Sequence, residues 1–234
     1  MMRALFEDEL KKLHVRFSEM GINVSEQIYR ATKAFVDHDK QLAQEVIDYD
    51  NETNDDEMGL EKQALELIAL QQPVATDFRV IISILKASSD LERVGDHAVG
   101  IARETIREKG SQRVPEIENQ ISKMSDEIRE MLSGVLDAYA ANDDAKATAV
   151  AKKDIEVDKH YIEIRDAITK AVAGDSTTAA ATSSYLLVIK LLERIGDHLV
   201  NISEWIVYSS AGKIVELNPG KSDPELLSRI MGGK

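Results

Sequence analysis

One seven-residue motif occurs twice in this sequence. Leu91–His97 reads LERVGDH, and Leu192–His198 reads LERIGDH 101 residues later. The register extends beyond the motif, because Phe35–Asp39 corresponds to Tyr139–Asp143 at an offset of 104 residues. The three-residue difference between the two offsets falls between elements, where a turn can absorb it. We therefore predict a duplicated unit, with two halves related by a pseudo-twofold axis.

Apolar residues recur every three or four positions in both copies, which predicts amphipathic helices. In the first copy the stripes cover residues 10–35 and 42–67, and a third helix follows Pro73 over about 74–108. Asp39 lies in the break between the first two stripes and is a predicted N-cap. In the second copy they cover residues 117–139 and 150–172, and a sixth helix ends near Tyr208. We expect an all-α fold of two tandem three-helix bundles, at residues 1–112 and 113–212, followed by a tail at 213–234.

The composition excludes several classes of site. The chain has no Cys, so a disulfide, a thiolate zinc site, an iron–sulfur cluster and a cysteine nucleophile are all impossible. It has 42 acidic against 29 basic residues, a formal net charge of −13, which disfavours nucleic acid and suits a cation or a basic partner. No signal peptide or membrane-spanning stretch is evident. We expect a cytoplasmic protein that reaches a membrane only through protein partners.

Each copy of the motif carries two carboxylates four residues apart, Glu92 with Asp96 and Glu193 with Asp197. Residues at this spacing share one face of a helix, where like charges repel. A hard cation would explain why the unfavourable pair occurs twice, because carboxylates are its natural ligands. These four residues are the main metal-ligand candidates. Weaker candidates on comparable faces are Asp50, Asn54, Asp154, Asp158 and Asn201. Asp55, Asp56 and Glu57 are interpreted as a plain charge run and are assigned no role.

The residues beside these carboxylates leave alternatives open. An ion-pair network involving Arg93 and Arg194 could neutralise the acidic faces without a metal. His97 and His198 could be ligands, but we favour a role in positioning ligands or in bonding between helices. The mid-helix glycines, Gly95 and Gly196, indicate a close approach either of a ligand or of a neighbouring helix. His14, His38 and His160 have no comparable setting and are assigned no role.

No sequence motif supports catalysis. The chain contains no H-E-x-x-H, Walker loop, G-x-S-x-G or G-x-G-x-x-G. No histidine has a Glu three residues before it, so the di-iron pattern of ferritin-like bundles is missing as well. These absences leave catalysis without support in the sequence but do not exclude it.

At the motif, the sequence resembles the PhoU family, regulators associated with the bacterial high-affinity phosphate transporter. That family repeats an E(D)-x-x-x-D signature once per three-helix half, and here Glu92/Asp96 and Glu193/Asp197 occupy those positions. The resemblance spans nearly the whole chain to about Gly212. One departure is Gly100, which stands where the second copy has Asn201, and it predicts unequal metal affinity of the two sites.

The resemblance implies a metal-binding adaptor that is not an enzyme and that self-associates as a dimer. Iron, zinc, manganese and magnesium are candidate metals. Its implied partners are the ATPase subunit of the phosphate ABC transporter and a sensor histidine kinase, and its implied effect is negative regulation of phosphate uptake and of phosphate-starvation signalling. Two alternatives stay open: a metal-buffering protein without a transporter partner, and a metal-independent helical scaffold.

Overall fold

A computed structural model describes residues 2–107, 113–174 and 179–218, with the side chains of residues 2, 179 and 180 left out. These residues form helices joined by short connections and contain no strand, as predicted. The helices are α1 (Met2–Asp37), α2 (Lys40–Asp48), α3 (Asp50–Gln71), α4 (Thr76–Arg107), α5 (Pro115–Ala141), α6 (Asp144–Ala151), α7 (Asp154–Gly174) and α8 (Ala179–Ala211).

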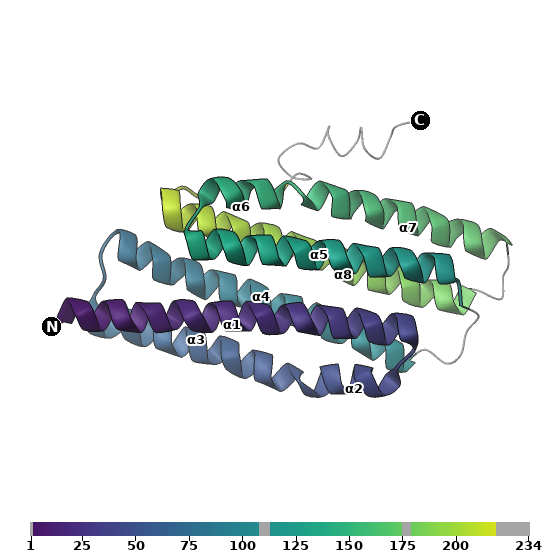
Figure 1. The fold of residues 1–234 in the computed structure, drawn as a ribbon, viewed down its shortest axis with the longest axis horizontal. Coiled ribbons are helices and arrows are strands. Elements are labelled where there is room, and N and C mark those ends of the chain that lie inside the picture. The colour runs from purple at the N-terminus through teal and green to yellow at the C-terminus, as the bar shows by residue number, and fades with distance from the viewer. Residues whose placement is uncertain (1, 108–112, 175–178, 219–234) are drawn as a thin grey trace.

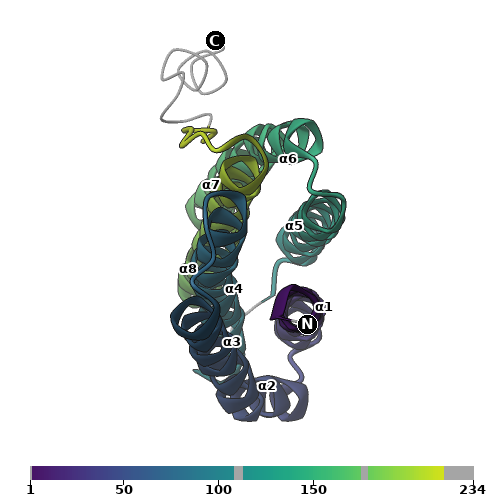
Figure 2. The same cartoon turned by 90° about the vertical axis from the view of Figure 1, so that its left-hand side faces the viewer.

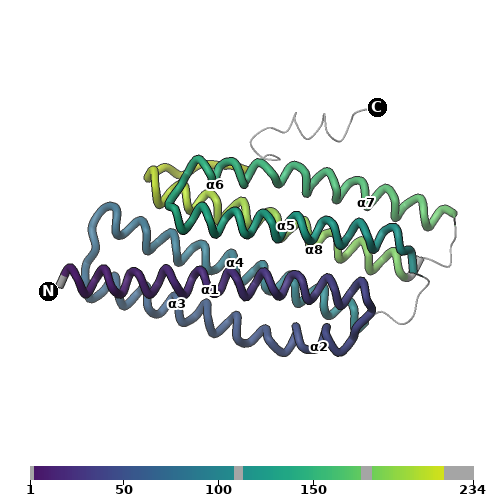
Figure 3. The backbone as a smooth tube through the Cα atoms, in the orientation of Figure 1, coloured from purple at the N-terminus to yellow at the C-terminus, as the bar shows by residue number. Residues whose placement is uncertain are grey.

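The second and fifth predicted helices are each divided in two. Helix α2 ends at Asp48 and α3 begins at Asp50, while α6 ends at Ala151 and α7 begins at Asp154. Figure 3 shows each short helix running directly into its longer neighbour. Apolar spacing misses these breaks because a stripe continues across a single bent turn. The breaks matter because each longer helix then begins with an aspartate.

Capping residues set the beginnings of the two short helices. The predicted N-cap Asp39 accepts hydrogen bonds from the backbone N–H groups of Gln41 and Leu42. Asp143, its equivalent in the second half, accepts from the N–H of Lys146. Such caps satisfy N–H groups that have no partner inside the helix. Helix α4 begins at Thr76, two residues after the predicted start, because Ala75 is in the left-handed region with φ of 46°.

The two halves pack against each other through their long helices (Figures 1 and 2). Helix α4 of the first half contacts α8 of the second, and α1 contacts α5. Helices α2 and α3 pack on α4 along one long side of the molecule, while α6 and α7 pack on α8 along the opposite side. One continuous apolar core extends through both halves.

In each motif the apolar residues lie in the core, while the carboxylates lie on a partly exposed face of the helix. Leu91 and Val94 in α4, and Leu192 and Ile195 in α8, are fully buried. The motif carboxylates lie on another side of the same helices and are partly exposed. Helices α3 and α7 pack on α4 and α8, so each motif faces the aspartate that begins the neighbouring helix.

The start of the predicted tail is held by the second half. The backbone N–H of Leu217 donates to Glu204 Oε1 at 2.7 Å, and Asn218 is 9% exposed. Residues 219–234 of that tail lie outside the described residues. The predicted unit boundaries at 112 and 212 remain predictions. In the described ranges, no helix is long and apolar enough to span a bilayer.

Candidate functional site

Four carboxylates from two helices form what we call the second acidic face: Asp154 and Asp158 of α7, and Glu193 and Asp197 of α8. Burial, and then the charges of Asp158, Asp197 and Glu193, raise the pKa of Asp154 to about 8. Burial and the charges of Glu193 and Asp197 raise the pKa of Asp158 to about 6. Mutual effects of this kind arise only between close carboxylates. The structure therefore brings these four predicted residues together.

Asp154 is the most constrained member of this face. Its side chain is 1% exposed, and Oδ1 is buried without a hydrogen-bond partner among the described residues. It points at Gly196 of the motif, where an added Cβ would overlap Asp154 Oδ1. The mid-helix glycine therefore makes room for a buried carboxylate from α7. A buried carboxyl group without a hydrogen-bond partner is costly, and this cost makes Asp154 a candidate metal ligand.

Two other groups touch this face, and neither was predicted. Lys190 Nζ contacts Glu193 Oε1 at 2.7 Å and Oε2 at 2.6 Å. Asn218 Nδ2 donates to Asp197 Oδ1 at 2.8 Å. Lys190 precedes the motif on the same helix face and could have been found by its i,i+3 spacing. Asn218 follows α8 through a loop, and no periodic signal could have indicated it.

The first acidic face comprises Asp50, Asn54 and Glu57 of α3 with Glu92 and Asp96 of α4. Burial, and then the charge of Asp96, raise the pKa of Asp50. Burial, Asp96, Glu57 and Asp50 likewise raise the pKa of Glu92. Asp50, Glu92 and Asp96 are thus close enough to influence one another, as their counterparts do. All five members are partly exposed, whereas Asp154 in the second face is buried.

Arg93 and Glu57 distinguish the surroundings of the first face. Arg93 forms ion pairs with the two motif carboxylates of its own helix: Nη1 is 3.3 Å from Asp96 Oδ2, and Nε is 3.6 Å from Glu92 Oε2. Its side chain is 62% exposed. Such an exposed pair contributes little to stability. Glu57 accepts a hydrogen bond from Ser89 at 3.0 Å. The sequence indicated a plain charge run at Glu57, so this member was missed.

The motif glycine of the first half meets neutral groups. A Cβ on Gly95 would lie 3.1 Å from Gln27 Oε1 and 3.2 Å from Thr53 Cγ2. Gln27 Nε2 donates to Thr53 Oγ1 at 2.7 Å, and both side chains are buried. These neutral groups occupy the position that the Asp154 carboxylate takes in the second half. The equivalent residues there are Met131 and Val157, which cannot form such a pair.

The motif histidines lie between the two halves. The ring centroids of His97 on α4 and His198 on α8 are 5.3 Å apart. His198 Nδ1 is 2.8 Å from Asp90 Oδ1, as expected for a histidine that bonds between helices. His97 Nε2 is buried without a partner within the described chain. Burial, His198 and the arginines Arg194 and Arg93 lower the pKa of His97 to about 4, so this ring is neutral at pH 7.

Asn201 has a partner outside the face to which it was assigned. Its Nδ2 donates to Asp90 Oδ1 of α4 at 3.0 Å. The equivalent contact in the other half joins Gly100 to Leu191, since a Cβ on Gly100 would lie 3.0 Å from Leu191 Cδ1. Both positions therefore face the opposite half of the molecule. The departure at Gly100 reflects a polar contact exchanged for an apolar one, which corrects our interpretation of Asn201 as an extension of the acidic face.

The two faces fit a metal ion in the type of donor they offer. Carboxylate and amide oxygens suit hard divalent cations, and the buried Asp154 Oδ1 has no other group to bind. As the side chains stand, no three His, Asp or Glu residues within the described ranges are arranged to hold a metal ion. A bound cation would have to draw the carboxylates closer together.

A family model for the PhoU domain matches this chain twice, at residues 17–105 and 121–206. The chain belongs to the PhoU family. The two matched segments contain the two motifs, one in each predicted unit.

Curated PhoU relatives align over nearly all of this chain. The phosphate-specific transport system accessory protein PhoU homolog of Streptococcus pneumoniae serotype 4 is 35% identical over 217 residues, which is 93% of this chain and 100% of the relative. The protein of the same description from Clostridium acetobutylicum is 36% identical over 219 residues, with coverage of 93% and 100%.

Two solved PhoU structures share the fold. The crystal structure of the phosphate transport system regulatory protein PhoU from Streptococcus pneumoniae has a TM-score of 0.84 at 33% identity, covering 90% of this chain and 99% of that one. PhoU from Pseudomonas aeruginosa has a TM-score of 0.81 at 33% identity, with coverage of 89% and 100%. The all-α fold of two three-helix halves is thus that of the family.

Proposed function

We propose that this PhoU-family chain is an accessory protein of a phosphate-specific transport system and carries metal ions on its two acidic faces. In the proposed role it acts in the cytoplasm as a homodimer and negatively regulates high-affinity phosphate uptake by the phosphate ABC transporter. It binds the ATPase subunit of the transporter, and through a sensor histidine kinase it also represses phosphate-starvation signalling. It has no enzymatic activity and binds no nucleic acid.

The accessory role is supported by relatives of matching length. The Streptococcus and Clostridium relatives are described as phosphate-specific transport system accessory proteins, and this chain covers each of them completely. An adaptor needs surfaces rather than a reaction centre, and the acidic balance of the chain suits basic partner surfaces.

One observation carries the metal proposal: both halves hold carboxylates together against their mutual repulsion. In the second face, Asp154 is kept buried beside Asp158, Glu193 and Asp197, which raises its pKa to about 8. An arrangement this unfavourable without a ligand becomes favourable when a cation neutralises it. Iron, zinc, manganese and magnesium are the candidate ions.

The residues divide between the two faces. Asp154, Asp158, Glu193 and Asp197 would hold metal in the second face, and Asp50, Asn54, Glu92 and Asp96 in the first. A bound ion supplies positive charge that cancels carboxylate repulsion and links α3 to α4 or α7 to α8. Helix positions at a docking surface would then depend on metal occupancy.

The metal proposal is tested by elemental analysis of protein purified without chelator. We expect metal in the wild type and none in the variant Glu92→Ala/Asp96→Ala/Glu193→Ala/Asp197→Ala. The matched control is Asp126→Ala/Glu130→Ala, which removes an exposed i,i+4 acidic pair from α5 and should retain metal. Equal metal content in wild type and fourfold variant would leave the metal-independent scaffold as the better description.

The partner proposal is tested separately by pull-down with the ATPase subunit of the phosphate transporter. We expect wild-type protein to be retained and the fourfold variant to be retained less. Binding that is absent with and without added metal would favour the metal-buffering alternative. Phosphate uptake by cells that lack the protein should rise when phosphate is abundant, and uptake that stays at the wild-type rate would contradict negative regulation.

A further inference from the structure

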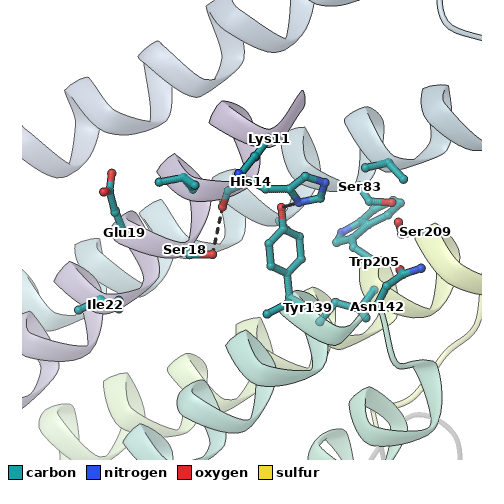
Figure 4. A pocket seen from close by; sticks show the side chains of 15 residues that line it. Lys11, His14, Ser18, Glu19, Ile22, Ser83, Tyr139, Asn142, Trp205 and Ser209 are labelled. Carbon is teal, nitrogen blue, oxygen red and sulfur yellow. Dashed lines mark hydrogen bonds between the residues drawn. The ribbon is translucent and has the colours of Figure 1, made fainter. Parts of the chain in front are cut away.

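A cavity of about 520 Å³ lies at one end of the interface between the two halves. Helices α1, α4, α5 and α8 all contribute to its wall (Figure 4). Aliphatic side chains make up much of the lining. The polar and aromatic groups used below are Lys11, His14, Ser83, Tyr139 and Trp205. The volume is within the range of about 300–1,000 Å³ that holds small organic ligands.

His14 and Tyr139 are joined across this cavity. His14 Nδ1 is 2.5 Å from Tyr139 Oη, and Figure 4 shows the two rings meeting between α1 and α5. Burial lowers the pKa of His14 and raises the pKa of Tyr139, so both are neutral at pH 7. The phenol then donates to Nδ1, and the imidazole proton is on Nε2. The His14 Nε2–H therefore remains a hydrogen-bond donor, and neither ring carries a negative charge.

Ser83 is the unexplained polar group of the cavity. Its side chain is 4% exposed, and Oγ has no hydrogen-bond partner among the described residues. A buried hydroxyl without a hydrogen-bond partner costs free energy of folding. An acceptor oxygen brought by a ligand would remove this cost.

The opposite end of the same interface shows what Ser83 lacks. The duplication pairs Ser83 with Ser184, and Trp205 with Glu104. Ser184 Oγ donates to Glu104 Oε1 at 2.7 Å, and Glu104 is 4% exposed. The chain thus supplies a carboxylate to the second serine. At Ser83 it places an indole where that carboxylate would be.

A second buried carboxylate at the opposite end is likewise matched by an aromatic ring at the cavity end. His14 corresponds to Glu118, which is 3% exposed. Glu118 accepts a hydrogen bond from Tyr185 at 2.9 Å and is paired with Arg113 at 2.7 Å and with His38 at 3.1 Å. One end of the interface is therefore occupied by two carboxylates of the chain. The cavity end has rings at both positions.

We propose that this cavity binds a small aromatic monocarboxylate, whose carboxylate accepts from Ser83 and whose ring packs against Trp205 and Tyr139. The ligand's carboxylate would accept from Ser83 as the Glu104 carboxylate accepts from Ser184 at the opposite end. Lys11 lies at the exposed side of the lining and attracts an anion, although Glu19 nearby opposes it. This site is separate from the acidic faces and does not depend on the proposed metal binding.

Trp205 is the single tryptophan of the chain, so its indole N–H gives one NMR signal at the cavity. The probe is trans-cinnamate, added to chelator-treated protein so that loss of metal cannot affect the result. We expect a saturable shift of that signal. Cinnamyl alcohol, which has the same ring and no carboxylate, should bind more weakly.

Three variants locate the binding. Ser83→Ala should weaken cinnamate binding about tenfold, the usual effect of removing a hydrogen bond to a charged group. Ser184→Ala, the same change at the equivalent position, should leave it unchanged. Ser209→Phe fills the cavity from its partly exposed side and should abolish binding.

Each other outcome overturns the proposal. No saturable shift up to the solubility limit of cinnamate would show that the cavity does not take this ligand class. Binding that survives Ser209→Phe would lie elsewhere. Binding that Ser83→Ala leaves unchanged, or that cinnamyl alcohol matches, would indicate an apolar groove suited to a partner helix.

Discussion

The two acidic faces share one motif but differ in what surrounds it. In the second face, Asp154 is buried beside Gly196 and has no hydrogen-bond partner for Oδ1 in the described chain. In the first face, Asp50 is partly exposed, and the Gln27–Thr53 pair lies against Gly95. A carboxylate and an amide–hydroxyl pair thus occupy equivalent positions beside the two glycines.

The residues that cause this difference lie outside the motif. Ser89 bonds to Glu57 in the first half, whereas the equivalent Lys190 contacts Glu193 and lies 5.6 Å from the Tyr161 ring in the second. The second face therefore combines Asp154, whose pKa is raised to about 8, with a competing cation, Lys190. A motif repeated within one chain does not guarantee two equivalent sites, because the neighbouring helices decide how deeply each carboxylate is buried and which charges surround it.

The largest expected effect concerns Asp154 in metal-free protein. Its native pKa of about 8 is above the unfolded value of about 4, so the native state holds an extra proton between these pH values. The free energy of unfolding should therefore fall as pH rises from 4 to 8. Asp154→Asn should remove that slope and stabilise the protein at pH 8 by on the order of 5 kcal/mol.

Urea unfolding at pH 5 and pH 8, with chelator present, measures this effect. The matched control is Asp50→Asn in the first face, where the group is partly exposed and the change should be several-fold smaller. Equal pH slopes for the two variants would show that Asp154 and Asp50 do not differ in burial.

The next effect compares the two motif glycines. Gly196→Ala forces a methyl group against the buried Asp154 and should destabilise by about 1–2 kcal/mol, because overpacking outweighs the gain in helix propensity. Gly95→Ala would place its Cβ 3.1 Å from Gln27 Oε1 and 3.2 Å from Thr53 Cγ2, tight contacts that a shift of a few tenths of an ångström can relieve, so the two terms should nearly cancel. Thermal unfolding of both variants in chelator gives the comparison, and a more damaging Gly95→Ala would reverse our ranking of the faces.

A smaller effect follows from exchanging Lys190 and Ser89. Lys190→Ser removes the cation from Glu193 and should strengthen binding of Mn²⁺ at the second face by about two- to fivefold, since a surface ion pair is worth at most about 1 kcal/mol. Ser89→Lys should weaken the first face by a similar factor. Mn²⁺ titration by isothermal calorimetry measures both, and unchanged affinities would show that this lysine does not compete with the metal.

The smallest expected effect is at Asn218. Asn218→Ala removes the donor to Asp197 and should lower the free energy of unfolding by about 0.5–1 kcal/mol. Amide hydrogen exchange over residues 213–218 should accelerate at the same time. Faster exchange without loss of stability would mean that the contact orders only the chain after α8.

Much of the fold could be predicted from the sequence. Helix positions followed from the apolar spacing, and the Asp39 cap followed from its residue type and place. The breaks at Tyr49 and Lys152 were missed because a bend of one turn leaves the apolar stripe intact. The left-handed residue at Ala75 was missed because nothing in its residue type favours that conformation.

The candidate site was predicted in part. The motif carboxylates and the aspartates that begin α3 and α7 were found because an i,i+4 spacing is visible in the chain. Glu57 was missed within a charge run, and Asn218 was missed because its contact depends on a loop. Asn201 was misassigned, because sharing a helix face with Asp197 did not indicate that the far end of this face meets α4. His14 was left without a role for a similar reason, since its partner Tyr139 is 125 residues away.

The sequence by itself determined the duplication, the helical class and the pairing of carboxylates, because these depend on spacing along one chain. Only the tertiary structure decided which equivalent positions became different. Packing of α3 on α4 and of α7 on α8 left Asp50 partly exposed and Asp154 buried. Packing between the halves bonded Ser184 to Glu104 and left Ser83 facing a cavity. Burial and the nearest charge depend on residues far apart in sequence, so a repeated motif cannot specify them.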